Sequence, residues 1–85
     1  MTKRACPCCG CLTLREPDPG SFEICEVCFW EDDKAQYSNP DYRGGANGPS
    51  LNEAKKNYLK FGASDQKLID CVRKPKAEEA PQSNQ

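Results

Sequence analysis

Two C-x2-C cysteine pairs are spaced so that four thiolates can bind one metal ion. Cys6 and Cys9 form the first pair, and Cys25 and Cys28 form the second. Two thiolates separated by two residues can reach the same ion from one tight turn, and two such turns supply a tetrahedron of sulfurs at about 2.3 Å. This spacing is typical of zinc sites. We therefore expect Cys6, Cys9, Cys25 and Cys28 to bind zinc (Zn2+), with iron as the less favoured alternative.

A second ligand register is open, because Cys8 and Cys11 also form a C-x2-C pair. The Cys6 and Cys9 register is favoured because Gly10 follows its second ligand. Glycine accepts the left-handed backbone that turns amide groups towards the sulfurs. In this register we expect Cys8 to be an exposed or partly packed thiol. Cys11 would then be a small apolar residue at the start of a strand.

A site of four thiolates is structural rather than catalytic, because it leaves no ligand position for water or substrate. The sequence contains no histidine, which excludes a Ser-His-Asp triad, a Cys-His nucleophile pair and any histidine-ligated metal. Cys71 stands alone beside apolar residues, and we expect it to be a buried core thiol. The sequence therefore predicts no enzyme activity.

The composition explains why this chain needs a metal to fold. Its 85 residues are 36% hydrophobic and 29% charged, with a mean hydropathy of −0.86, so a core alone would stabilise it only marginally. A net charge of −1 does not favour binding to nucleic acid or to an anionic membrane. No signal peptide or membrane-spanning segment is visible, so we expect a cytoplasmic protein whose thiols stay reduced.

A β-hairpin is predicted between the two cysteine pairs. Leu12–Arg15 and Ser21–Ile24 have the alternating pattern of strands, and Pro17–Gly20 is a strong turn signal. This hairpin would bring the two cysteine turns together. We therefore expect a zinc ribbon or rubredoxin-like arrangement over residues 5–30.

One or two short helices are predicted after a polar loop over residues 31–49. Ser50 and Glu53 fit a capping box, and an apolar stripe follows until Gly62, a natural helix stop. A second, shorter helix would start near residue 64 and face Leu68, Ile69 and Val72 inwards. The chain is thus expected to be one small α+β domain over residues 1–74, with its helical part over 50–74 and a disordered tail over 75–85.

The residues after the second cysteine pair have two interpretations. Trp30 is expected to pack on the cysteine turns, and the alternative is an exposed Trp30 with an acidic rim in a partner site. The three acidic residues that follow also fit a helix cap or a turn. The candidate partner surface consists of Trp30, Glu31, Asp32, Asp33, Tyr42 and Arg43.

Blocks of sequence around the cysteines and the first helix resemble a known family. The blocks are Cys6–Gly10, Leu12–Leu14, Glu23–Asp33, Ser50–Ala54 and Phe61–Gly62. On these residues the chain resembles the bacterial cysteine-rich CPCC domain family over residues 5–63, with the tail outside the resemblance. The resemblance implies a small bacterial domain with metal-binding cysteines, and it implies no catalytic residues.

Four functions fit these features, and we favour a zinc-stabilised module that binds an unknown protein partner. The second is a thiol redox or metal-responsive protein that uses Cys8 and Cys11. Small size and acidity also fit an antitoxin-like or immunity protein. The third main candidate is a nucleic-acid-binding zinc ribbon that uses Lys3, Arg4 and Arg15, or Lys55, Lys56, Lys60 and Lys67.

Overall fold

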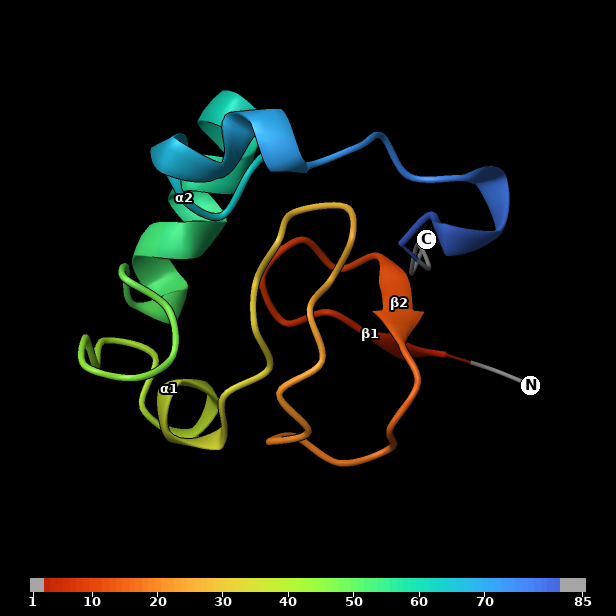
Figure 1. Ribbon diagram of the computed structural model, residues 1–85. Helices are drawn as coiled ribbons and strands as arrows, with labels where there is room; N and C mark the ends of the chain where they lie inside the picture. The colour runs from red at the N-terminus through yellow and green to blue at the C-terminus, as the bar shows by residue number, and fades with distance from the viewer. Residues whose placement is uncertain (1–2, 82–85) are drawn as a thin grey trace.

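The computed structural model describes residues 3–81, and it places two strands and a cysteine-rich region beside a helical region (Figure 1). This arrangement confirms the expected small α+β fold. No helix among the described residues is long and apolar enough to cross a membrane. The elements are β1 (Arg4–Ala5), β2 (Leu12–Leu14), α1 (Lys34–Ser38), α2 (Leu51–Phe61) and the 3-10 helices η1 (Gln66–Cys71) and η2 (Ala77–Glu79).

The β-hairpin forms around the first cysteine pair rather than between the two pairs. β1 pairs antiparallel with β2, and residues Cys6–Cys11 form the connection. The expected pairing of Leu12–Arg15 with Ser21–Ile24 is therefore wrong. Ile24 instead pairs with Glu31, across the second cysteine pair, in an isolated bridge. Each cysteine turn reverses the chain within a few residues, so the segments that flank one turn lie closest to each other.

The core lies where the cysteine turns meet α2. Helix α2 begins at Ser50, whose hydroxyl accepts from the Glu53 backbone N–H while the Glu53 carboxylate accepts from Ser50, and it ends at Gly62 with φ of 79°. Both ends of this helix were predicted correctly. The buried apolar residues that pack together are Cys6, Cys8, Cys11, Leu14, Cys25, Val27, Cys28, Trp30, Leu51 and Ala54.

The second predicted helix is the 3-10 helix η1, and it leaves Cys71 at the surface. Cys71 and Ile69 are both exposed, so the expectation that they face the core is wrong. A 3-10 helix has three residues per turn, which moves side chains away from the apolar stripe expected for an α-helix. A substitution at Cys71 therefore removes a thiol without disturbing the core.

One buried glutamine organises the polar loop that contains α1. The Gln36 amide nitrogen donates to the carbonyl oxygens of Tyr42, Asn47 and Pro49 at 3.0 to 3.3 Å. Its amide oxygen accepts from the backbone and side-chain N–H groups of Asn47 at 3.1 and 2.9 Å. These bonds close the loop onto α1, a helix that the polar sequence did not reveal.

Gly45 packs so closely against this glutamine that we expect Gly45→Ala to destabilise the protein. A Cβ atom at Gly45 would lie 2.7 Å from both Gln36 Cγ and Asp33 Oδ2. Because Gln36 is buried and held by several hydrogen bonds, the overlap should cost about 1–3 kcal/mol. Gly48→Ala is the matched control, since its Cβ would approach only the Asp65 carboxylate, at 3.3 Å. Urea unfolding measures the free energy of unfolding of both variants, and an equal loss of stability in the two would argue against this packing.

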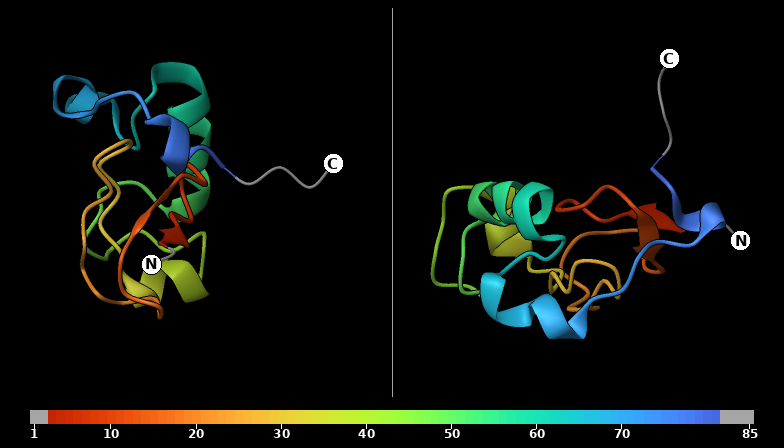
Figure 2. Two further views of the ribbon diagram at one scale, coloured as in Figure 1. Left: turned by 90° about the vertical axis from the view of Figure 1, so that its right-hand side faces the viewer. Right: turned by 90° about the horizontal axis from the view of Figure 1, so that it is seen from above.

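The segment after η1, residues 72–81, packs back across the cysteine-rich region, and we call it the C-terminal strap. Helix η2 lies beside β2 in every view (Figures 1 and 2). The Arg73 guanidinium donates to the Glu79 carboxylate at 2.8 and 2.9 Å and to Glu26 at 3.1 Å. We expected residues 75–85 to be disordered, but the described part is ordered and Glu79 is buried. Residues 82–85 lie outside the described residues.

Ionised Glu79 is expected to hold the strap in place at neutral pH. The Arg73 guanidinium and the Lys76 backbone N–H lower the pKa of Glu79 from 4.5 to about 2. Because the pKa is depressed, this contribution is complete above about pH 4.5 and is lost as the pH falls towards 2. Glu79→Gln should therefore speed backbone hydrogen exchange in the strap several-fold at pH 7. Glu16→Gln, at an exposed position, is the control, and equal exchange in both variants would contradict the prediction.

Candidate metal centre

Residues Cys6–Cys11 and Cys25–Trp30 fold into the same turn, and we call them the first and second cysteine turns. In each, the backbone N–H of the first residue donates to the carbonyl of the sixth, at 2.8 and 3.0 Å. The N–H of the fifth residue donates to the carbonyl of the first, at 2.8 and 2.7 Å. That fifth residue, Gly10 or Phe29, has a positive φ of 81° or 68°. The repeated backbone places two thiols on each turn in equivalent positions.

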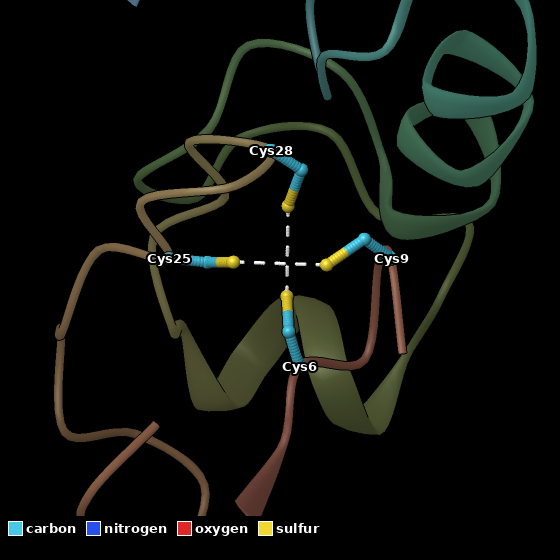
Figure 3. Close-up of side chains that lie close together, drawn as sticks. All are labelled: Cys6, Cys9, Cys25 and Cys28. Atoms are coloured by element: carbon cyan, nitrogen blue, oxygen red, sulfur yellow. Dashed lines mark hydrogen bonds between the residues drawn. The ribbon is translucent and has the colours of Figure 1, made fainter. Parts of the chain in front are cut away.

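The two cysteine turns face each other and gather four thiols (Figure 3). The Sγ atoms of Cys6, Cys9, Cys25 and Cys28 all lie within 4.8 Å of one another. Cys6 pairs with Cys28, and Cys9 pairs with Cys25, each at 3.6 Å. In a regular tetrahedron with metal–sulfur bonds of about 2.3 Å, the sulfurs are about 3.8 Å apart. The cluster is therefore compatible with one four-coordinate metal ion.

Cys8 and Cys11 lie outside this cluster and serve as buried core residues. Because the two turns are equivalent, Cys8 in the first turn corresponds to Val27 in the second, and Cys11 corresponds to Trp30. All four of these side chains are buried. The expectation for Cys11 is confirmed, and the exposed or partly packed position expected for Cys8 is wrong. Burial raises the pKa of the Cys11 thiol, which keeps it protonated.

The clustered thiols cannot all ionise without a cation. Hydrogen bonding to Cys25 raises the pKa of Cys9 and of Cys28. The hydrogen bonds that Cys25 accepts, of which the bond with Cys28 has the largest effect, lower the pKa of Cys25. These hydrogen bonds thus favour a thiolate at Cys25 next to protonated Cys9 and Cys28. A metal ion replaces those protons, so binding is coupled to proton release.

Two hydrogen-bond donors next to the cluster reach the sulfurs directly. The Thr13 hydroxyl donates to Cys25 Sγ at 3.0 Å, and the Cys11 backbone N–H donates to Cys9 Sγ at 3.4 Å. Such bonds spread the negative charge of a metal-bound thiolate. Sequence reasoning missed Thr13, because a single threonine in a short strand carries no distinguishing pattern.

Tyr58 of α2 connects the helical region to the cysteine turns. Its side chain packs against the core cluster. Burial, together with the nearby Cys11 and Cys9 thiols, raises the pKa of Tyr58 to about 12. The phenol therefore stays neutral at physiological pH and adds no charge beside the thiols.

The predicted partner surface is not formed, because half of its residues support the fold from inside. Trp30 and Asp32 are 0% exposed, and Asp33 is also buried. Asp33 caps α1 by accepting from the Gln36 backbone N–H at 3.2 Å. The partner-site interpretation is therefore wrong for Trp30, Asp32 and Asp33. The packing interpretation is confirmed for Trp30, and the capping interpretation is confirmed for Asp33.

The other members of that predicted surface lie partly or fully in solvent. Glu31 is half-buried, and Tyr42 and Arg43 are exposed on the loop. The Arg43 guanidinium binds the Glu53 carboxylate at 2.5 and 2.8 Å. Among residues 3–81, no hydrogen bond or ion pair links Glu31 to Tyr42 or Arg43.

The basic residues proposed for nucleic-acid binding also differ in their surroundings, because some are engaged within the fold and others are exposed. Arg4 donates to the buried Asp32 carboxylate at 2.5 Å and to two backbone carbonyls, so its charge serves the fold. The lysines of α2 are exposed. Of the three N-terminal basic residues proposed to bind nucleic acid, Arg4 is therefore already engaged within the fold.

A family model described as cysteine-rich CPCC matches residues 4–79. This range includes all four clustered cysteines, α2 and most of the C-terminal strap, so it is longer than the resemblance expected over residues 5–63. No curated protein matches the chain.

Proposed function

The chain belongs to the cysteine-rich CPCC family, and from its clustered thiols we propose that it is a zinc-stabilised protein-interaction domain without enzyme activity. The observation that carries the proposal is the set of four sulfurs within 4.8 Å of one another. Four thiolates fill the coordination sphere of zinc and leave no position for a substrate. The ion would therefore supply folding energy rather than chemistry.

Zinc is favoured over iron because small, closed four-cysteine sites of structural type typically hold zinc. The thiols must stay reduced to bind it, which supports a cytoplasmic location. Elemental analysis of the protein purified under reducing conditions is expected to give about one zinc per chain. A stoichiometric amount of iron, with its visible thiolate absorption, would overturn the assignment to zinc. Absence of any bound metal would overturn the whole proposal.

The interaction role is supported by apolar side chains that the fold leaves in solvent. The exposed large apolar residues include Phe22 and Ile24. A chain of this polarity gains nothing in stability from keeping them exposed, and such residues often mark binding surfaces. We expect affinity capture with the zinc-loaded chain to retain a partner that is lost after chelation.

A second candidate function, metal release by thiol oxidation, is supported by the position of Cys8. Cys8 packs in the same buried core cluster as Cys28, a proposed ligand. Hydrogen peroxide would oxidise the Cys8 and Cys28 thiols to a disulfide and be reduced to two water molecules. Zinc release under mild peroxide should then slow in a Cys8→Ser/Cys11→Ser variant. Equal release from both proteins would exclude this function.

A further inference from the structure

We propose that a groove between the end of α2 and the C-terminal strap binds an acidic segment of a partner protein that inserts one apolar side chain. This inference rests on the proposed interaction function and names the surface and the partner chemistry. We call the surface the lysine groove. Its walls are Tyr58, Phe61 and Gly62 of the α2 end, and Val72, Lys74 and Pro75 of the strap.

The lysine groove is large enough for an anchoring side chain. Its cavity measures about 270 Å³, which exceeds the volume of a leucine or phenylalanine side chain. Phe61 and Val72 are only half-buried, so apolar surface is left in solvent along both walls. Nothing lies within 4 Å of the position that a Cβ atom would take at Gly62. The groove is therefore open at this point and can admit another chain.

The charges at the lysine groove are all positive. Lys74 and Arg73 are among the lining residues, and the Lys60 ammonium lies 5.3 Å from the centre of the Phe61 ring. No carboxylate lines the groove, whereas three other cavities of the molecule are each lined by acidic side chains.

The cations of the groove differ in their availability. Arg73 is already paired with Glu26 and Glu79. Lys60 and Lys74 form no ion pair with any residue among 3–81. Two ammonium groups without ion-pair partners beside a concave apolar surface are complementary to a carboxylate next to an apolar side chain.

An acidic protein segment fits this groove better than nucleic acid does. Nucleic-acid binding draws most of its affinity from several phosphate contacts and from stacked bases. The groove offers two free cations, and its Phe61 ring is already covered on one side by Lys60. A single apolar anchor with nearby carboxylates matches both the apolar walls and the two cations of the groove.

The groove shares a wall with the metal centre. Tyr58 lines the groove and also lies beside the Cys11 and Cys9 thiols. Metal binding that orders the cysteine turns should therefore also order the groove. We expect peptide binding to require the zinc-loaded protein.

The experiment is a selection of displayed random peptides, about 15 residues or roughly four helical turns long, against the zinc-loaded full chain. Enriched peptides should carry a leucine or phenylalanine next to Asp or Glu. Their affinity should fall about tenfold for Lys60→Glu/Lys74→Glu, which changes the sign of two nearby charges. The control Lys34→Glu/Lys67→Glu changes the net charge equally and should bind as the wild type does.

A second pair of variants tests the apolar anchor separately from charge. Phe61→Ala should weaken binding of the enriched peptides about tenfold. Leu59→Ala should leave it unchanged, although Leu59 is 86% exposed on the same helix. Circular dichroism and zinc content confirm that each variant is folded.

The outcomes separate this inference from the function on which it rests. Peptides that bind all variants equally would overturn the lysine groove but leave an interaction domain that uses another surface. The absence of any enriched peptide would overturn both. Binding of a single-stranded oligonucleotide, or of vesicles of phosphatidylglycerol and phosphatidylcholine, that is lost in Lys60→Glu/Lys74→Glu while peptides fail to bind would assign the groove to that other ligand and overturn the inference.

Discussion

Replacing Cys6 or Cys28 by serine is expected to abolish both metal binding and the cooperative unfolding transition. The two Sγ atoms lie 3.6 Å apart in the buried cluster, and each would supply one quarter of the coordination sphere. A serine hydroxyl keeps its proton at neutral pH and does not replace a thiolate. Metal binding contributes on the order of 10 kcal/mol to the folding of small zinc domains. That is as large as the whole stability of a typical domain, about 5–15 kcal/mol.

The matched control for this prediction is Cys71→Ser, which removes a thiol from an exposed position. It should keep about one metal ion per chain and the wild-type melting curve. Cys8→Ser and Cys11→Ser should be less stable but still metal-bound, because these residues fill the core without belonging to the cluster. Zinc content and thermal melts by circular dichroism measure both effects. A metal-loaded Cys6→Ser variant that still melts cooperatively would contradict the role of the cluster.

Arg4→Ala is expected to cost about 3–5 kcal/mol, the second largest effect. Asp32 is fully buried, and its Oδ2 accepts from Arg4 at 2.5 Å and from the Ser21 hydroxyl at 2.9 Å. Its Oδ1 has no hydrogen-bond partner among the described residues. Removing the guanidinium would therefore leave a buried carboxylate without its counter-charge. The ion pair between Arg4 and Asp32 also links β1 to the segment after the second cysteine turn.

The control for Arg4 is Arg43→Ala, which breaks an ion pair whose side chains are 70% and 41% exposed. Water and salt screen such pairs, so little change in stability is expected. The double variant Arg4→Ala/Asp32→Asn should be more stable than Arg4→Ala alone, because the unpaired charge is gone. Guanidinium unfolding of the metal-loaded proteins measures these differences. Similar losses for Arg4→Ala and Arg43→Ala would contradict the proposed role of the buried pair.

The features predicted correctly from the sequence depend on short spacings along the chain. The two C-x2-C pairs identify the four clustered thiols, since a single turn decides which way both sulfurs of a pair point. Ser50 and Glu53 mark the start of α2 for the same reason, because the capping box involves residues within one helical turn.

The features that were missed depend on contacts between distant residues. Arg4 meets Asp32, and Arg73 meets Glu26, across 28 and 47 positions of sequence. Neither pair follows any periodic pattern, so the buried acid and the ordered strap were not foreseen. The disordered tail was predicted from composition alone. Composition does not show that the Glu79 carboxylate pairs with the Arg73 guanidinium.

The repeat of the cysteine turn in the sequence gives a second reason to expect a buried Trp30. The second cysteine turn repeats the first with an offset of 19 residues, which sets Trp30 in the position of Cys11. Cys11 was expected to be an apolar filler beside a strand. The same reasoning applied to Trp30 supports the expected packing on the cysteine turns over a partner site, in agreement with its 0% exposure.

The central claim is that the thiolates of Cys6, Cys9, Cys25 and Cys28 together hold one zinc ion. X-ray absorption at the zinc edge of the purified protein measures the number, type and distance of the atoms bound to the metal. We predict four sulfurs at about 2.3 Å and no nitrogen or oxygen ligand. The same spectrum should be obtained from the Cys8→Ser/Cys11→Ser variant. Fewer than four sulfurs in the wild type, or loss of sulfur ligands in that variant, would contradict the claim.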